Sequence, residues 1–410
     1  MMRRFSLWPV LLSLCSIAGA QIDGFIESRL GTRTQSDPAQ DQAAIREVRL
    51  QLGHVGFYGP LDVDLKVDFL YDDLDGRRSD VDLARGKGWL DLRTASVAFA
   101  PVEWMEVKAG RQVFTWGTGD LLFINDLFPK DWTSFLNGRD VAYLKAPSDA
   151  VSFANYVGDW TVDLIWTPRF NADRWLDGDG ISVQGSPFTP DNPMRADVPT
   201  ASEWAGRLSR YIGSAEAALY FYDGYWKSPG GFDAAGRARF PRLRVYGGSV
   251  QWPGWSGLLN VEAGYYDSRD ARSGRDPQVP NNEARFLAGY SRELMANFTV
   301  GLQGYVEWMQ DYGHYQDALP EGMPERDELR QVTTLRLTRL LMNQNLTLSG
   351  FLFVSPTDED AYLRASAEYK WSDQLTTTVG VNHFSGRESH TFFGQLEDNS
   401  NVYFAIRRWF

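Results

Sequence analysis

The sequence predicts an all-β protein, an antiparallel transmembrane β-barrel of about 18 strands, with 16 as the alternative count. First, apolar and polar residues alternate with period two in runs that are mostly nine to thirteen residues long. Strands of globular proteins average about 5–6 residues, whereas a tilted strand needs about 9–11 to cross a bilayer. Second, the connections between runs alternate between short and long. Third, the 410 residues include 57 aromatic side chains (15 Trp, 18 Tyr and 24 Phe), many of them near the ends of runs.

The first 20 residues predict a secretory signal peptide. Arg3 and Arg4 precede a short apolar stretch at 5–14, and the small residues AGA at 18–20 are typical of a cleavage site. The single cysteine, Cys15, lies inside this predicted signal and leaves a lipoprotein signal as the weaker alternative. Cleavage would remove two of the 41 basic residues, leaving 39 against 53 acidic residues and a charge of -14.

The clearest strand is 61–71, LDVDLKVDFLY, in which five apolar residues share one face and charged residues occupy the other. The apolar face is Leu61, Val63, Leu65, Val67 and Phe69, and the charged face is Asp62, Asp64, Lys66 and Asp68. The candidate strands are 22–33, 44–57, 61–71, 89–99, 105–116, 148–157, 160–168, 203–212, 214–223, 242–252, 258–267, 283–293, 298–310, 329–340, 346–354, 361–371, 375–384 and 401–410.

Short and long connections follow each other along the chain. Two to five residues join the strands of most pairs, as at 58–60 and 158–159, whereas the next connection is long, as at 72–88, 117–147 and 169–202. Outer-membrane barrels combine short periplasmic turns with long extracellular loops in this way. A sheet in lipid must also close, because an open edge would leave backbone N–H and C=O groups without partners. A soluble propeller or β-helix is the alternative, but no fixed repeat supports it.

Residues 21–410 are predicted to form a single barrel domain. The first strand begins at Ile22, directly after the predicted signal, and leaves no room for an N-terminal plug or energy-coupling segment. This argues against a gated, energy-coupled transporter. The last ten residues, NVYFAIRRWF, resemble the C-terminal signal of barrels that the outer-membrane assembly machinery inserts.

The less apolar face of each strand is expected to line the lumen. It carries both signs of charge, so the residues could either bias ion passage or simply pair across strands. The basic set is Arg49, Arg93, Lys108, Arg207, Arg336, Arg364 and Arg407. The acidic set is Glu47, Asp62, Asp64, Asp68, Asp91, Glu106, Asp163, Glu203, Glu216, Glu262, Glu307 and Glu368.

The connection 117–147 is unusually apolar for a loop, with eight large apolar residues between Leu121 and Phe135. Exposed apolar surface of this extent is unfavourable, so we expect the segment to fold inward and narrow the lumen. An extracellular cap or a partner-binding surface is the alternative. An inward fold would present Asp120, Asp126, Lys130, Asp131, Arg139 and Lys145.

A family resemblance starts from the motifs around this segment. Gly110-Arg111-Gln112, Trp116-Gly117, Gly119-Asp120 and Asp131-Trp132 resemble the strand-and-loop signature of porin-like outer-membrane proteins, and most of all the alginate-export type of barrel. The resemblance covers about thirty residues. It implies an eighteen-stranded channel with an arginine-rich constriction that passes an acidic polysaccharide, with Arg111 on the constriction side.

Other classes of function find little support. The four histidines form no catalytic motif, and the acidic turns at 72–76, 177–180 and 358–360 suit solvated turns better than calcium loops. We therefore expect no enzyme activity, no metal and no cofactor. A formal charge of -12 argues against nucleic-acid binding.

The sequence thus predicts an outer-membrane channel of the porin kind, through which hydrophilic solutes diffuse without energy coupling. Its expected partners are outer-membrane lipid and lipopolysaccharide and the barrel assembly machinery. Two alternatives stay open. One is an export barrel for a polysaccharide or lipid secretion system with periplasmic partners, and the other is a non-conducting scaffold barrel.

Overall fold

The computed structural model describes residues 22–37, 40–74 and 80–410, and the predicted signal segment 1–20 lies outside them. Within this part of the chain, eighteen strands form one antiparallel sheet, which confirms the predicted fold class. The strands are β1 Ile22–Arg33, β2 Ala43–Tyr58, β3 Leu61–Asp72, β4 Leu90–Val102, β5 Met105–Gln112, β6 Ser148–Val157, β7 Trp160–Thr167, β8 Glu203–Ile212, β9 Ala215–Tyr225, β12 Arg242–Gly254, β13 Gly257–Ser268, β14 Glu283–Met295, β15 Phe298–Met309, β16 Leu329–Leu341, β17 Leu346–Ser355, β18 Asp360–Ser372, β19 Leu375–Gly386 and β20 Asn401–Trp409.

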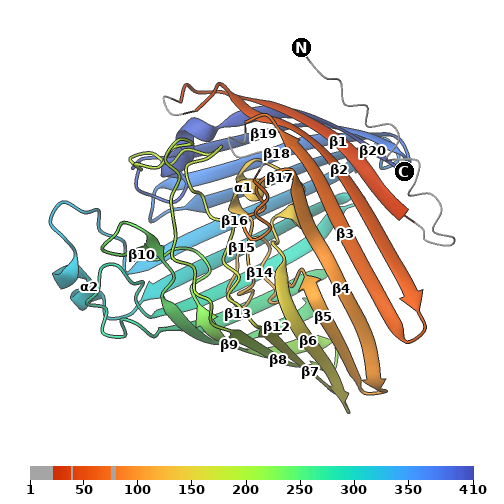
Figure 1. Ribbon diagram of the computed structural model, residues 1–410, viewed down its shortest axis with the longest axis horizontal. Coiled ribbons are helices and arrows are strands. Elements are labelled where there is room, and N and C mark those ends of the chain that lie inside the picture. The colour runs from red at the N-terminus through yellow and green to blue at the C-terminus, as the bar shows by residue number, and fades with distance from the viewer. Residues whose placement is uncertain (1–21, 38–39, 75–79) are drawn as a thin grey trace.

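The sheet closes into a barrel because β1 pairs with both β2 and β20. Ile26 lies opposite Leu50 on one side and opposite Arg408 on the other. Every other strand pairs with its two neighbours along the chain, and β9 pairs with β12 past a small hairpin of β10 Gly231–Phe232 and β11 Ala238–Arg239. Figure 1 shows the ring of strands. Closure gives each strand a hydrogen-bonding partner on both sides, as a lipid environment requires.

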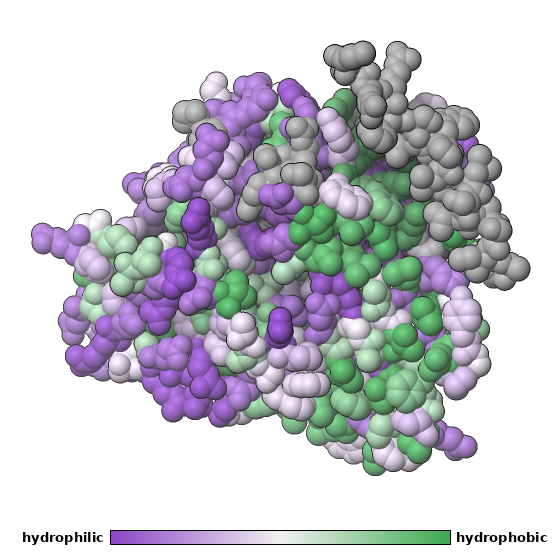
Figure 2. Space-filling model, viewed as in Figure 1, coloured by the Kyte–Doolittle hydropathy of each residue, from purple (hydrophilic) through white to green (hydrophobic). Residues whose placement is uncertain are grey.

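The two faces of the wall differ in the way the alternation predicts. On β3, Leu65 is 41% exposed on the outer face, whereas Asp68 is fully buried on the inner face. The same contrast recurs around the ring, so the outside carries exposed Val, Leu, Ile and aromatic side chains. Figure 2 shows hydrophobic residues gathered over the strands and hydrophilic residues over the end that carries the long connections. The apolar band is the surface that acyl chains would cover.

The connections separate by length onto the two ends of the barrel. Tight turns join β2 to β3, β6 to β7 and β8 to β9, and Gly158 (φ 60°) and Gly213 (φ 63°) adopt the left-handed conformation that such turns need. The long connections carry the short helices α1 Trp132–Leu136, η1 Val141–Tyr143, α2 Tyr312–Ala318 and η2 Gly394–Asn399. Figure 1 shows α2 and β10 beyond one end of the barrel and α1 among the strands. None of the described helices is long and apolar enough to cross a membrane.

Most strand boundaries fall within three residues of the prediction, and the largest difference is at the end of β5. β5 ends at Gln112, whereas the alternation predicts a strand over 105–116. The ring centroids of Phe114 and Trp116 each lie 5.0 Å from that of Phe128. Residues 113–116 therefore leave the sheet to pack against the segment that follows.

Candidate functional site in the barrel interior

The segment 117–147 joins β5 to β6, and its first part is anchored by one side chain, Glu262 of β13. The Glu262 carboxylate accepts five hydrogen bonds from the segment. Oε2 accepts from the backbone N–H of Thr118 (2.7 Å) and Gly119 (3.2 Å) and from the Thr118 hydroxyl (3.2 Å). Oε1 accepts from the N–H of Asn125 (2.7 Å) and from its side-chain amide (3.0 Å). An irregular backbone can be buried here because a carboxylate replaces the missing sheet partners.

A second side chain, Gln303 of β15, holds the next residue from both sides. Its amide oxygen accepts from the N–H of Asp120, and its amide nitrogen donates to the Asp120 carbonyl, each at 2.8 Å. The Asp120 carboxylate in turn pairs with Arg336 of β16, with Nη2 at 2.7 Å from Oδ1. Leu121 follows at φ 60°, a conformation that costs an L-residue with a Cβ about 1–2 kcal/mol. The backbone of Leu121 is therefore fixed by its surroundings.

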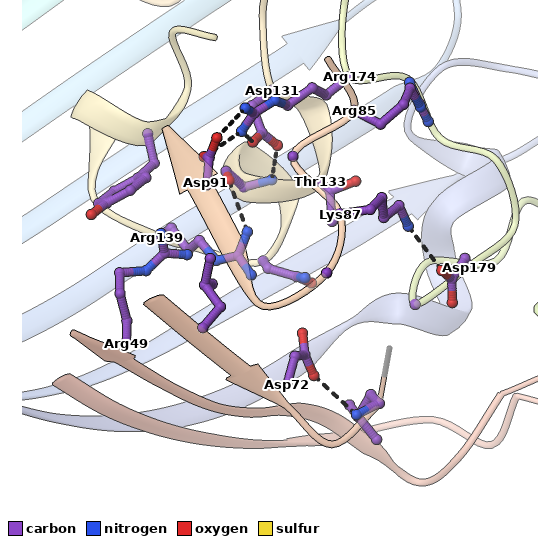
Figure 3. A pocket seen from close by; sticks show the side chains of 18 of the residues that line it. Arg49, Asp72, Arg85, Lys87, Asp91, Asp131, Thr133, Arg139, Arg174 and Asp179 are labelled. Atoms are coloured by element: carbon purple, nitrogen blue, oxygen red, sulfur yellow. Dashed lines mark hydrogen bonds and ion pairs between the residues drawn. The ribbon is translucent and has the colours of Figure 1, made fainter. Parts of the chain in front are cut away.

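The middle of the segment forms α1, which begins at a capping aspartate. The Asp131 side chain accepts a hydrogen bond from the N–H of Ser134 at 2.7 Å. The same carboxylate pairs with Arg174 at 3.1 Å, and Arg174 also forms two hydrogen bonds with Asp91 of β4, at 2.7 and 2.8 Å. Figure 3 shows Arg174 between the two carboxylates. Burial alone would lower the pKa of Arg174, but Asp91 and Asp131 raise it above its ordinary value.

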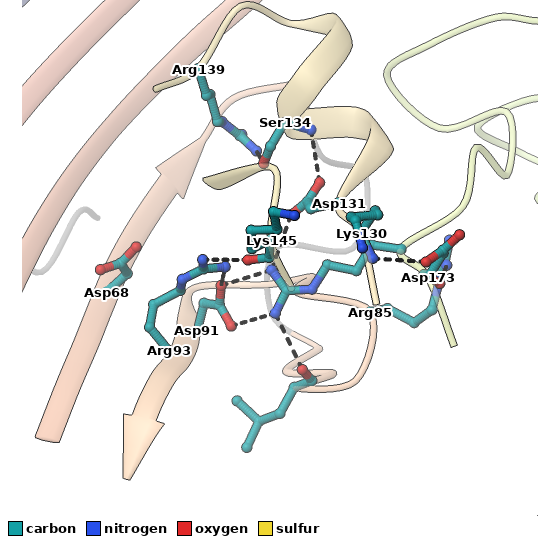
Figure 4. A network of polar contacts seen from close by, with 12 residues as sticks. Asp68, Arg85, Asp91, Arg93, Lys130, Asp131, Ser134, Arg139, Lys145 and Asp173 are labelled. Atoms are coloured by element: carbon teal, nitrogen blue, oxygen red, sulfur yellow. Dashed lines mark hydrogen bonds and ion pairs between the residues drawn. The ribbon is translucent and has the colours of Figure 1, made fainter. Parts of the chain in front are cut away.

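Two lysines share one carboxylate at the centre of the segment. The Asp126 side chain accepts from Lys130 Nζ at 3.0 Å and also pairs with Lys145. Burial lowers the pKa of Lys145 to about 8, and the neighbouring charge of Lys130 adds to this effect, whereas Asp126 opposes it. Figure 4 shows Lys130 and Lys145 close to Asp131 and the inner wall.

Arginines of the wall complete the attachment of the last part of the segment. Arg29 of β1 donates to the Gly138 carbonyl at 2.9 Å, and Arg364 of β18 donates to the carbonyls of Gly138 and Arg139. Arg93 of β4 donates to the carbonyls of Ala142 and Lys145, at 3.1 and 2.6 Å. The segment contacts β1, β2, β4, β13, β15, β16, β17, β18 and β20, which together make up about half of the ring.

The apolar residues of the segment pack against an aromatic stretch of the inner wall. Phe135 lies edge-on to Phe353 and Tyr362, with ring centroids 5.9 and 5.5 Å apart. Ile124 is fully buried beside Tyr266, whose hydroxyl donates to the Ile124 carbonyl. Several kcal/mol of apolar burial thus add to the polar anchors, at about 1.5–3 kcal/mol for each large side chain.

Cavities lie on both sides of this segment. A cavity of about 470 Å³, the outer cavity, lies toward the long connections, and one of about 200 Å³, the inner cavity, lies toward the short turns. Leu121 lines both of them. A further space of about 530 Å³ forms the mouth above the larger cavity, and a small polar cavity of about 80 Å³ lies beside Arg174 and Arg49 (Figure 3).

Most of the site residues predicted from the sequence meet around the segment 117–147. Arg139 pairs with Glu47 at 3.0 Å, and Arg49 pairs with Asp68 while its guanidinium lies over the Tyr143 ring. The predicted residues that the structure brings together are Arg49, Arg93, Asp120, Asp126, Lys130, Asp131, Arg139, Lys145, Arg336 and Arg364.

Three predicted residues, Lys108, Arg207 and Arg111, lie apart from the segment. Lys108 is 3.8 Å from Asp64 on the wall, and Arg207 pairs with Asp163 and Glu216 on the strands beside its own. These two illustrate the alternative reading of the lumen charges, in which they pair across strands.

Arg111 is placed differently from its predicted position on the constriction side. It lies opposite Asp149 in the register and pairs with the exposed Asp149 side chain at 3.0 Å. Arg111 also donates to the carbonyls of Leu92 and Leu83, at the end of the barrel with the long connections. Residues 108 and 111 are three apart, so a regular strand turns them to opposite faces. We therefore leave Arg111 out of the candidate site.

The anchoring residues were only partly visible in the sequence. The period-two alternation assigns Glu262 and Glu47 to the inner face, but nothing in the sequence indicates which segment they bind. Gln303 is uncharged, and Arg174 lies in a long connection with no periodic pattern. In the described part of the chain, no group of three or more His, Cys, Asp or Glu side chains is placed to hold a metal ion.

Comparison with known proteins gives matches to solved structures alone. No known family and no curated protein matches the chain. The fold is similar to Acinetobacter baumannii OccAB1 (TM-score 0.54, 10% identity, 95% of each chain covered) and to Pseudomonas aeruginosa OccK5 (TM-score 0.53, 12% identity, 95% of this chain and 97% of the other). A mutant of the Rh. blastica porin aligns at a TM-score of 0.42, with 11% identity over 95% of this chain and 100% of the other. The first two likenesses show a shared porin-like barrel fold. These two likenesses do not extend to the alginate-export type of barrel, so that finer resemblance stays a prediction.

Proposed function

We propose that the protein is an outer-membrane channel through which small solutes diffuse passively, and that the segment 117–147 lies across the lumen and narrows it. The observation that carries this proposal is Leu121, which lines the cavities on both sides of the segment. The fold likeness to OccAB1 and OccK5 and the apolar outer band support the membrane location. Contacts of the segment with β1 and β4 on one part of the ring and with β13 and β16 on another support its position across the lumen.

In this proposal the segment is a fixed constriction. Glu262 and Gln303 hold the backbone on both sides of Asp120, so solutes pass the Leu121 side chain without displacing the segment. Phe351 of β17 lines the inner cavity beside Leu121, and Arg336 lies over the Phe351 ring at 4.6 Å. The narrowest point therefore has an apolar edge and a charged edge. Lipid, lipopolysaccharide and the barrel assembly machinery are the partners that this location requires.

The test compares Leu121→Gly with the wild type in single-channel recordings. Glycine adopts a φ of 60° without strain, so this change removes the side chain at the constriction and leaves the anchors in place. We expect a higher conductance in Leu121→Gly. Leu122→Gly is the matched control, because Leu122 lines the outer cavity but not the inner one. The conductance of this variant should stay near the wild-type value.

The alternatives predict different recordings. If the protein is an export barrel, the wild type should conduct poorly and Leu121→Gly should conduct well. A scaffold barrel should conduct in neither form, and this result would overturn the proposed function.

A further inference from the structure

The outer cavity of about 470 Å³ has a wall that is mainly apolar. Of its 24 lining residues, 15 carry aliphatic or aromatic side chains and 10 of these are aromatic, so most of the surface offers a solute no hydrogen bond. The rings come from the segment 117–147, from the wall, from the connection that follows β9 and from the connection before β20. Trp132 and Phe392 meet edge to face, with ring centroids 5.9 Å apart.

The polar groups of this wall already bind one another. Lys227 forms hydrogen bonds of 2.7 and 2.8 Å with both carboxylate oxygens of Glu203. Asp173 accepts from the Trp132 indole at 3.0 Å, from the Ser228 hydroxyl at 2.6 Å and from the Lys130 N–H at 2.7 Å. A sugar, which must exchange many hydrogen bonds with water for hydrogen bonds with the wall, finds few partners here.

Glu307 pairs with two of the three arginines that line the cavity. Its carboxylate accepts from the Tyr305 hydroxyl at 2.6 Å and lies within 3.5 Å of both Arg285 and Arg330. Arg330 is shared with Asp358 at 2.5 Å. The arginines of the cavity are therefore neutralised by neighbouring carboxylates and offer little attraction to an anion.

The mouth above the cavity is acidic. Its lining includes eight carboxylates and three arginines, a formal charge of -5, and it shares Glu307, Arg326, Arg330 and Phe392 with the cavity below. A mouth of one dominant sign repels ions of that sign and concentrates the opposite sign. An anionic solute is thus disfavoured before it reaches the apolar wall.

We propose that the outer cavity is a binding site for small solutes that have an apolar ring or short hydrocarbon body and carry no negative charge. This deepens the proposed function, because the bound solute would be one that the channel passes. The aromatic wall binds the apolar body, and the acidic mouth favours a cationic group over an anionic one. Phe392 is 38% exposed and lines both the mouth and the cavity, so it is the first ring that such a solute meets.

Ring-matched probes test the proposal in the full-length protein. Benzylammonium, benzyl alcohol and benzoate share one ring and differ in charge, and glucose has a similar size without the ring. Block of the single-channel current should be strongest for benzylammonium, weaker for benzyl alcohol and weakest for benzoate and glucose. Equal block by benzoate and benzylammonium, or stronger block by glucose, would overturn the proposal.

Two variants locate the site. Phe392→Ser should weaken the block by benzylammonium roughly five- to tenfold, the effect expected from the loss of an aromatic contact. Phe232→Ser is the matched control, because Phe232 is 40% exposed on β10 and lines neither space. Equal effects of the two changes would contradict the assignment of the site.

A binding assay separates this proposal from the proposed function. Trp132 and Trp226 line the cavity, so benzylammonium should change the tryptophan fluorescence of the detergent-solubilised protein in a saturable way. Phe392→Ser should weaken the binding that this titration measures. Saturable binding in a protein that does not conduct would retain the site and refute the channel. Conduction without saturable binding or block would retain the channel and refute the site.

Discussion

Replacing Glu262 by alanine should release the segment 117–147 while leaving the barrel wall closed. The wall is held by its backbone ladder, whereas the N–H groups of Thr118, Gly119 and Asn125 depend on this one carboxylate. In Glu262→Ala, the N–H groups of the half-buried Thr118 and Gly119 and of the buried Asn125 lose their acceptor. They can regain one only by turning toward water, which requires the segment to leave the wall.

The magnitude follows from the five hydrogen bonds. Each hydrogen bond to a charged acceptor contributes roughly 1.5–3 kcal/mol. Because all five share a single carboxylate we count one for each oxygen, a loss of about 3–6 kcal/mol. A loss of 3 kcal/mol raises the population of the detached segment roughly a hundredfold, at about 1.4 kcal/mol per factor of ten.

Hydrogen exchange and single-channel recording measure this release together. Amide exchange at Thr118–Asn125 should accelerate by about two orders of magnitude while exchange in the strands stays at the wild-type rate. The open-channel current should become larger and noisier. Glu262→Gln is the graded control, because one acceptor oxygen remains, and its effects should lie between those of wild type and Glu262→Ala. Unchanged exchange at Thr118–Asn125 would refute the role assigned to Glu262.

Three further predictions concern the outer face, the pH dependence and ion selectivity. Leu65→Arg on the exposed face of β3 should destabilise the inserted barrel by about 2–4 kcal/mol in urea titrations in lipid, and normal stability would place Leu65 inside. Burial holds the pKa of Lys145 near 8, below its ordinary value, so between pH 8 and 10 the detached segment binds more protons than the attached one. Protection of the segment from hydrogen exchange, corrected for the intrinsic exchange rate, should therefore rise from pH 8 to 10. Lys145→Met should abolish that rise, and its persistence would assign the titration elsewhere. Arg336→Ala leaves the Asp120 charge beside the inner cavity, so reversal potentials should shift toward cations, and a shift toward anions would contradict this.

The strands could be predicted from the sequence because their pattern is local. Period-two alternation and the lengths of the connections lie within each run, and all eighteen predicted strands are found, with 18 rather than 16 confirmed as the count. The early end of β5 was missed because Phe114 and Trp116 continue the apolar alternation while packing against Phe128.

The attachment of the segment could not be predicted because its partners are far apart in sequence. Glu262 lies 144 residues from Thr118, and Arg336 lies 216 residues from Asp120. Alternation assigns Glu262 to the inner face, but only the closed ring brings it to the segment. The amide of Gln303 carries no charge or motif to mark it. Composition did identify the segment itself, because its apolar residues are too many for an exposed loop.

Liposome swelling with solutes of graded size tests the central claim most directly. Liposomes containing the purified wild-type protein should swell in small sugars such as arabinose, with no partner and no energy source, and progressively less in disaccharides and tetrasaccharides. Leu121→Gly should move the size limit upward. Swelling no faster than in protein-free liposomes, for both the wild type and Leu121→Gly, would contradict a passive channel narrowed at Leu121.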